Sequence, residues 1–362
     1  MTMSPRVCAV LPLALTLSLI MLTSCDESTG PAGGDVPGFV LEAEVAVGEN
    51  PRAVTAAGDH YVVANRYQSL MLIDAATLTV TDTLDPAGFF PTEIRYHAAS
   101  QTLVVTDDAS GQVRWVDLPA LTMTDTRTIP AIHDPFFSNP AGLDYDADND
   151  RFYALETRGG TIAVIPRSPG PVDTVRYRPQ AEGSYSIEVG LATAVDEALD
   201  RLFLTSRNES KLFVYETSGM TKLDSLTAED GVLGINSLLT DAANGHLVLS
   251  NQQAVAVGGG RYEGTLDIYD GATLEYLMGV PVPDYPEEGG MTWVTEGSSM
   301  AVVSGTWLIE FSTPDYQRLH AMDLESEGTR VAYDPVRSRF LVTFEDEDVV
   351  RVYTRAQAVS SY

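Results

Sequence analysis

The chain has 362 residues, with 22 Lys or Arg against 51 Asp or Glu, which gives a formal net charge of −29. Binding to nucleic acids or to anionic lipid headgroups requires many cationic contacts, so this balance argues against both. Such a charge destabilises a fold by self-repulsion unless salt screens it. It therefore indicates either a saline habitat or an acidic, solubilising surface encoded by a GC-rich genome.

Residues 1–24 have the pattern of an export signal. Arg6 supplies the positive charge, and the apolar stretch 7–21 is short for a membrane span. The stretch ends in Leu22-Thr23-Ser24-Cys25, which resembles the lipobox of bacterial lipoproteins. That resemblance implies cleavage before Cys25 and attachment of lipid to its thiol. The alternative is an ordinary secretory signal that leaves Cys25 as a free thiol.

Residues 25–38 are rich in Gly, Pro, Ser and Asp, which is typical of a flexible tether. The expected location is the bacterial cell envelope, with the protein lipid-anchored and facing the periplasm or the cell surface. The only other cysteine, Cys8, lies in the signal. The predicted globular domain, residues 39–362, therefore has no disulfide, no thiolate metal site and no cysteine nucleophile.

A unit of four short apolar runs recurs seven times along this domain. In the first copy the runs lie at 53–55, 61–64, 70–73 and 78–84, separated by turns rich in Gly, Asp, Asn and Ser. Later copies begin near residues 93, 142, 190, 237, 291 and 330. This spacing of roughly 40–50 residues is the period of a four-stranded propeller blade. No sustained 3.6-residue period predicts helices.

The seventh copy ends before a fourth strand can form. Residues 39–47 supply the missing strand, and their pairing with 349–354 would close the ring without an open sheet edge. The sequence thus predicts an all-β fold: a seven-bladed β-propeller of four-stranded antiparallel blades, closed by an N-terminal strand and monomeric. A ring of six or eight blades, with the fifth copy split or with copies merged, is the alternative.

The first copy resembles the YVTN-type β-propeller repeat of about 40 residues. The matching positions are Val47-Gly48, Pro51, the YVVAN run at 61–65, Ile73-Asp74 and Thr77. The match weakens in later copies. The resemblance implies a superfamily of exported propellers that includes binding proteins and lactonase-like enzymes, so it indicates a fold more than a function.

Irregular insertions are expected to gather on one face. In a propeller, the connections between blades and those between second and third strands share a face, and the insertions at 88–91, 130–139, 183–186, 252–264 and 282–290 belong to these connections. Aromatic side chains beside a few cations are typical of recognition surfaces. The candidate ligand-binding residues are His133, Phe136, Phe137, Tyr185, Arg261, Tyr262 and Tyr285, with Phe89 and Phe90 beside them. The alternative is that the Phe pairs plug the channel or pack between blades.

Polar residues also precede several first strands, where they would face the mouth of the central channel. The candidates for metal ligands are Asn139, Glu188 and Asn236, with Asn50 and Glu327 in similar places. Gluconolactonase-like propellers hold a divalent ion with such oxygens, and that resemblance implies Ca²⁺ or another divalent cation that polarises a lactone carbonyl. The ligand spacing and the base of that family cannot be matched here, and a water-filled polar mouth is the alternative.

The acidic run 144–150 (DYDADND) is predicted to be a turn. A calcium loop of the EF-hand type needs Gly at its sixth position and Glu at its twelfth, where this chain has Asn149 and Leu155. No G-x-S-x-G motif and no pair of histidines at ligand spacing is present. The sequence therefore favours a non-catalytic binding or scaffold module without a cofactor, whose partner is a protein, glycan or small molecule. A metal-dependent hydrolase of the lactonase type is the alternative.

Overall fold

The computed structural model describes residues 38–356 apart from 67–68, 131–139, 157–159, 178–191, 207–209, 258–260, 285 and 287–289. The predicted signal peptide, Cys25 and all but the last residue of the predicted tether lie outside this part of the chain. Within it, no helix is long and apolar enough to cross a membrane.

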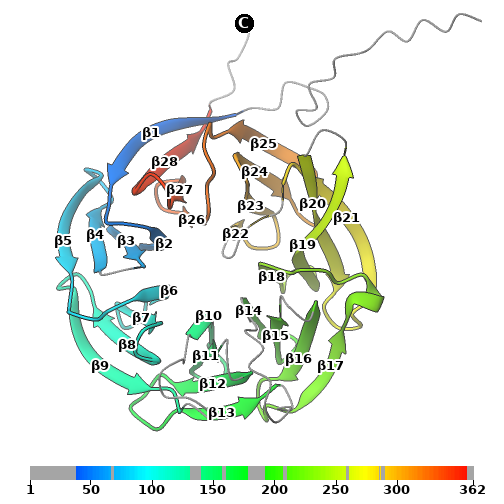
Figure 1. The fold of residues 1–362 in the computed structure, drawn as a ribbon, viewed down its shortest axis with the longest axis horizontal. Helices are drawn as coiled ribbons and strands as arrows, with labels where there is room; N and C mark the ends of the chain where they lie inside the picture. Colours follow the sequence, from blue (N-terminus) through cyan, green and yellow to red (C-terminus); the bar gives the residue numbers. More distant parts are fainter. Residues whose placement is uncertain are drawn as a thin grey trace, which may run out of the picture. The chain divides into compact units, whose positions relative to one another are not determined.

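Seven four-stranded antiparallel sheets form the blades of a ring (Figure 1). Blade 1 contains β2 (Pro51–Ala57), β3 (His60–Asn65), β4 (Ser69–Asp74) and β5 (Thr79–Leu84). Blade 2 contains β6 (Pro91–His97), β7 (Thr102–Asp107), β8 (Gln112–Asp117) and β9 (Thr122–Thr128). Blade 3 contains β10 (Pro140–Asp146), β11 (Arg151–Glu156), β12 (Thr161–Pro166) and β13 (Asp173–Arg176).

The next three blades follow the same order. Blade 4 contains β14 (Thr193–Asp196), β15 (Arg201–Ser206), β16 (Lys211–Glu216) and β17 (Lys222–Leu226). Blade 5 contains β18 (Leu238–Asp241), β19 (His246–Val257), β20 (Arg261–Asp270) and β21 (Tyr276–Val282). Blade 6 contains β22 (Met291–Thr295), β23 (Ser299–Ser304), β24 (Trp307–Ser312) and β25 (Arg318–Asp323). The helical content of the described residues is one short 3₁₀ turn, Ala228–Asp230.

Blade 7 joins the two ends of the chain. It contains β26 (Val331–Asp334), β27 (Arg339–Phe344), β28 (Val349–Arg355) and, as its outermost strand, β1 (Phe39–Ala46). β1 runs antiparallel to β28, from the Phe39–Arg355 pair to the Ala46–Val349 pair. The predicted fold, with seven blades and N-terminal closure, is confirmed, and the rings of six or eight blades are excluded.

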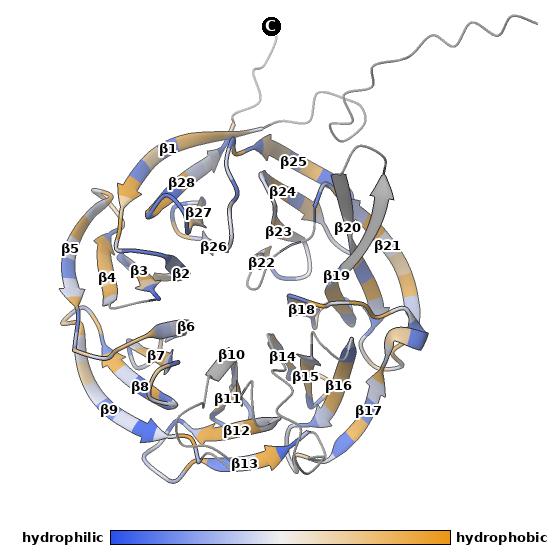
Figure 2. Ribbon diagram, viewed as in Figure 1, coloured by the Kyte–Doolittle hydropathy of each residue, from blue (hydrophilic) through white to orange (hydrophobic). Residues whose placement is uncertain are grey.

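The core lies between neighbouring blades. A second strand such as β7 is buried along its whole length, whereas the outermost strand β5 is exposed at nearly every position. Figure 2 shows hydrophilic and hydrophobic residues mixed along outermost strands such as β5 and β9. The reason is geometric: a middle strand has another blade against each of its faces, so it needs a continuous apolar run, as buried strands of other folds do.

In three of the blades, an arginine at the start of the second strand links its blade to the next one. The preceding turn reads Asp-x₄-Arg in blades 3, 4 and 7, and the Asp carboxylate accepts backbone N–H groups of the turn. The Arg guanidinium crosses to the next blade and donates to a backbone carbonyl just after its third strand. These donor–acceptor pairs are Arg151–Thr217, Arg201–Gly271 and Arg339–Ala75.

The acidic run at 144–150, predicted to be a turn, forms one at 147–150, whereas residues 144–146 are the end of β10. Asp144 accepts a hydrogen bond from the backbone N–H of Val195 (2.8 Å), and Asp146 accepts one from the backbone N–H of Asn149 (3.0 Å). Asp150 accepts one from the hydroxyl of Tyr145 (2.7 Å). These carboxylates therefore stabilise blade 3 and its contact with blade 4.

Tyr61 links blade 1 to blade 7 and is expected to make the free energy of unfolding fall at alkaline pH. Its side chain is fully buried, and its hydroxyl donates to Asp334 Oδ2 at 2.8 Å. Burial raises the pKa of Tyr61 to about 12. Because the unfolded phenol ionises from about pH 10 while the folded one stays neutral, the free energy of unfolding should fall between pH 10 and pH 12.

The expected loss from Tyr61 is roughly 2 kcal/mol by pH 12. It is measured from urea unfolding of the wild type and of Tyr61→Phe between pH 9 and pH 12. The variant starts less stable, because Asp334 loses one of its hydrogen-bond donors, and the difference in the free energy of unfolding between the two proteins narrows as the pH rises. If the difference in the free energy of unfolding between the two proteins stayed constant over this range, Tyr61 would not be held neutral by the fold.

Candidate functional site

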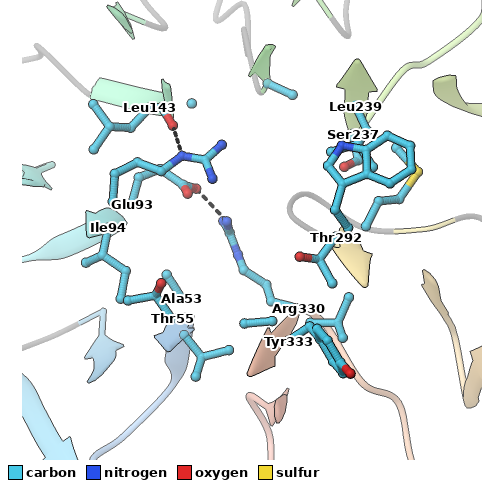
Figure 3. A pocket seen from close by; sticks show the side chains of 18 of the residues that line it. Ala53, Thr55, Glu93, Ile94, Leu143, Ser237, Leu239, Thr292, Arg330 and Tyr333 are labelled. Atoms are coloured by element: carbon cyan, nitrogen blue, oxygen red, sulfur yellow. Dashed lines mark hydrogen bonds and ion pairs between the residues drawn. The ribbon is translucent and has the colours of Figure 1, made fainter. Parts of the chain in front are cut away.

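The seven first strands surround a cavity of about 350 Å³ around the axis of the ring (Figure 3). In blades 3 and 4 only residues at or near the entry of the first strand line the cavity, such as Leu143 and Thr193. In blades 1 and 7 the lining runs along most of the first strand, from Ala53 to Ala56 and from Arg330 to Tyr333. The cavity thus extends along the first strands from their entries, which adjoin the connections between blades.

An ion pair spans one side of the cavity. Arg330 directly precedes β26 in blade 7, Glu93 lies on β6 in blade 2, and their Nη1 and Oε1 atoms are 2.6 Å apart. Figure 3 shows Arg330 reaching across to Glu93. β2 of blade 1 lies between β26 and β6, and the small side chains of Ala53 and Thr55 leave room for the pair.

Hydroxyl groups of the second strands fix the backbone at both ends of this ion pair. The N–H of Glu93 donates to Thr106 Oγ1 (2.9 Å), and the N–H of Arg330 donates to Thr343 Oγ1 (3.1 Å). Blades 4 and 5 repeat the contact, from Ala192 to Thr205 and from Ser237 to Ser250. A Ser or Thr near the end of the second strand is therefore the sequence signal that positions the entry of the first strand.

Arg95 is the other cation at the cavity, two residues further along β6. Its Nε donates to the carbonyl of Leu143 (2.7 Å), and its Nη2 lies 3.1 Å from Asp144 Oδ1. About half of the Arg95 side chain is exposed, while Arg330 is 5% exposed. Each described charged group that lines the cavity is thus matched by an opposite charge from another blade.

The opposite wall, from blades 4 to 6, has no charged residue among its described lining residues and combines hydroxyl-bearing with apolar side chains. Ser237 and Thr193 line it, and Trp293 adds an apolar surface while its Nε1 donates to the carbonyl of Thr240 (3.0 Å). The hydroxyl of Thr193 and both side-chain amide atoms of Asn236, the residue before Ser237, are buried and have no hydrogen-bond partner among the described residues. These atoms have almost no accessible surface, so they are closed off from the open space of the cavity.

The predicted metal ligands are only partly described. Asn139 and Glu188 lie outside the described residues, whereas Asn236 lies at the entry to β18, 1% exposed. In the part of the chain that the structure describes, no group of three or more His, Cys, Asp or Glu residues could hold a metal ion. The divalent cation stays a prediction from sequence.

Most of the predicted aromatic patch also lies outside the described residues: His133, Phe136, Phe137, Tyr185 and Tyr285. Phe89 is described, and it is 1% exposed in the core between blades 1 and 2. The interpretation of Phe89 as a surface residue is therefore wrong, and its alternative, packing between blades, holds. The cause is local: one Phe of the GFFP sequence turns inward to fill the core.

The expected loop at 252–264 is also corrected. β19 and β20 continue as a hairpin, in which Val255 pairs with Glu263 and Val257 pairs with Arg261. Arg261 and Tyr262 therefore lie on strand β20. At these residues β20 pairs with β19 alone, because its pairing with β21 begins at Gly264. The alternation Ala-Val-Ala-Val at 254–257 is a strand signal that sequence reasoning missed, because the three glycines at 258–260 indicated a loop.

This hairpin projects from the face that carries the connections between blades. Leu238 of β18 lines the cavity and pairs with Leu249 of β19, so the later residues of β19 lie beyond the cavity level. On the other side, β21 accompanies β20 only as far as the Gly264–Val282 pair. The outer part of the hairpin is thus a two-stranded extension beyond the four-stranded sheet of blade 5.

No family model and no curated protein matches this chain. Among solved structures, 1729 chains resemble it, and one of them is Raptor from Chaetomium thermophilum. The match to Raptor has a TM-score of 0.71 at 11% identity. It covers 89% of this chain, which spans only 29% of the length of Raptor. The likeness is one of fold alone.

Proposed function

We propose that this protein is a binding module of the bacterial cell envelope. It is anchored through lipid on Cys25, and it contacts its partner with the face that carries the connections between blades and between second and third strands. The observation that carries the proposal is the β19–β20 hairpin, which extends beyond its blade on this face.

A further feature supports this face over the opposite one. In blades 3 and 4 the axial cavity is lined only near the entries of the first strands, which adjoin this face. No His or Cys is among the described residues that line the axial cavity, and the carboxylate of Glu93 there is held by Arg330. A role in recognition therefore accounts for more of this geometry than a hydrolytic one.

The export and anchoring part of the proposal rests on the sequence. The lipobox-like Leu22-Thr23-Ser24-Cys25 follows an apolar stretch and precedes a Gly- and Pro-rich segment. The YVTN-like first repeat supports the same placement, because that superfamily consists of exported propellers. A tether of this composition would hold the propeller off the membrane with freedom to turn toward a partner.

Photo-crosslinking in the native envelope tests the proposed face. A benzoyl-phenylalanine at Tyr262, on the hairpin, is expected to give a discrete crosslinked product in the membrane fraction. The matched control is the same probe at Val336, which is 78% exposed on the turn between β26 and β27, on the opposite face. The Cys25→Ser variant is expected to leave the membrane fraction.

Equal products from Tyr262 and Val336, or none from Tyr262, would contradict the assignment of the binding face. Membrane retention of the Cys25→Ser variant would separately contradict the lipid anchor.

A further inference from the structure

The outermost strand of blade 5 has no charged side chain. β21 reads YLMGVPV from Tyr276 to Val282, and it forms the free edge of its sheet on the outer circumference of the ring (Figure 1). A free edge can pair with a strand of another chain, and proteins commonly prevent this with charged side chains on the edge strand. Each of the other six outermost strands has at least one carboxylate: Glu42, Asp82, Asp125, Asp173, Asp224 and Asp323, in chain order.

β21 also exposes three large apolar side chains in a row. Tyr276 is 52% exposed, Leu277 is 42% exposed and Met278 is 39% exposed. β1 exposes Val40 and Leu41 in the same way, but Glu42 follows them directly. Among the outermost strands, the combination of exposed apolar side chains with an uncharged edge is therefore particular to β21. Contiguous apolar exposure of this kind marks interaction sites.

The fold holds this edge in place. Val282 is buried in the core between blades 5 and 6, and the ring of Tyr276 packs edge-on against that of Tyr269, with 5.5 Å between the ring centroids. The hydroxyl of Tyr276 lies over Gly279, where a Cβ atom would come within 2.7 Å of it. An edge that is already ordered loses little conformational entropy when a strand pairs with it.

The backbone of β21 sets the length of edge that is available. On the inner side, β20 pairs with β21 from Tyr276 to Val282. Pro281 has no N–H group, so an incoming strand meets a missing donor there. The available edge is therefore Tyr276–Val280, which suits one short extended segment.

Charges at the two ends of β21 indicate the kind of segment. Glu275 directly precedes the strand and is exposed, and Asp284 lies two residues after the end of the strand. The net charge of −29 adds to the field of these carboxylates. Basic residues at both ends of an incoming strand would be attracted to the edge, whereas acidic ones would be repelled.

A second copy of this chain fits the edge poorly. Antiparallel pairing of two copies of β21 about Gly279 would place Glu275 of one copy opposite Pro283 of the other, next to Asp284. Like charges close together across two strands are destabilising. Each copy also carries the net charge of −29, so charge complementarity favours a basic partner over a dimer.

We propose that the edge of β21, from Tyr276 to Val280, pairs with an extended segment of another protein, in which apolar residues lie between basic residues at both ends. Main-chain hydrogen bonds supply the affinity, and the exposed apolar side chains with the flanking carboxylates supply the specificity. This edge lies on the rim of the ring, so the proposal does not rest on the proposed function. Crosslinking at Tyr262 can fail while strand pairing at β21 succeeds, and the reverse.

A library of short random peptides displayed on phage tests the proposal. The purified full-length protein selects the peptides, and its Met278→Lys variant removes those that bind elsewhere. The retained peptides are expected to be rich in β-branched and aromatic residues, with Lys or Arg at their ends. Fluorescence anisotropy of the best synthetic peptide should show binding to Met278→Lys at least about tenfold weaker than to the wild type, because lysine puts a repelling charge on the edge.

Leu223→Lys is the matched control. It puts a lysine at an exposed position of β17, a strand that already carries Lys222 and Asp224, and it should change peptide affinity by less than about twofold. Both variants change exposed side chains and should unfold like the wild type. If Met278→Lys lowers the melting temperature, Leu277→Lys takes its place in the binding measurements.

Backbone methylation of the peptide distinguishes strand pairing from side-chain contact alone. In a paired strand, alternate residues direct their N–H groups toward the neighbouring strand. N-methylation of one alternate set should therefore abolish binding, whereas N-methylation of the other set should leave it nearly unchanged. The same peptide with Glu in place of its basic residues should bind at least about tenfold more weakly at low salt.

The proposal is overturned if no peptide survives the removal step with Met278→Lys, or if both methylated sets weaken binding equally. Equal affinity of the Glu-containing peptide would refute the basic partner. Analytical ultracentrifugation covers the remaining occupant: a concentration-dependent dimer that is lost in Met278→Lys would show that a second copy pairs with this edge instead.

Discussion

Deletion of residues 39–46 from the full chain is expected to destroy the stable monomeric propeller. β1 buries Phe39, whose ring lies 5.0 Å from that of Phe340, and Val45. Burial of two such side chains contributes about 3–6 kcal/mol. The deletion also exposes the edge of β28. Since the net stability of folded proteins is about 5–15 kcal/mol, this loss removes a large part of it, and together with the open edge it should lower the melting temperature sharply and make the protein aggregate.

The measurement is thermal unfolding together with size-exclusion chromatography. A matched control deletes eight residues from the predicted tether, 28–35, and should unfold like the wild type. A deletion of 39–46 that remains monomeric with an unchanged melting temperature would show that blade 7 does not need its fourth strand.

Arg339→Met is expected to lower the free energy of unfolding by about 3 kcal/mol, by breaking a partly buried ion pair and several hydrogen bonds. Arg339 Nε donates to Glu42 at 2.7 Å, and its Nη1 donates to the backbone carbonyl of Ala75 in blade 1. The same guanidinium lies against Tyr61. Methionine keeps the length and apolar stem of arginine but satisfies none of these groups.

Lys222→Met provides the control for Arg339→Met. Lys222 is an exposed cation on the outermost strand of blade 4, so its replacement should change stability by less than about 0.5 kcal/mol. Urea unfolding measures both values. If Arg339→Met and Lys222→Met have equal effects, the link between blades 7 and 1 is not a significant source of stability.

The architecture was accessible from sequence because propeller blades repeat their burial pattern. Runs such as 61–64 and 70–73 are continuous because the second and third strands are covered on both faces. The closing strand was found by counting, since the seventh copy lacks a fourth run and residues 39–47 supply one. No property of a single residue was needed for either inference.

The cavity was not predicted, because its chemistry comes from residues far apart in sequence. Glu93 and Arg330 belong to the second and seventh copies, and only ring closure brings them together around β2. Each charge read alone is an ordinary residue on a strand or just before one. A comparison of the seven first strands position by position could have singled them out, because the corresponding position in blade 1 is the small residue Ala53. Asn236 was singled out by its place before a first strand, and the structure does put it at the entry to β18.

The position of β1 also sets the order in which the protein can finish folding. β1 must wait for β28, whose residues lie more than 300 positions later in the chain. At a synthesis rate of about 5–20 residues per second, that wait lasts roughly 15–60 s. During this time a strand with a free edge is available to other chains. Glu42 and Glu44 give β1 two negative charges, which later pair with Arg339 and Arg351 of blade 7. The same carboxylates thus disfavour pairing of β1 with other chains before the ring closes, and they stabilise the closed ring through ion pairs afterwards.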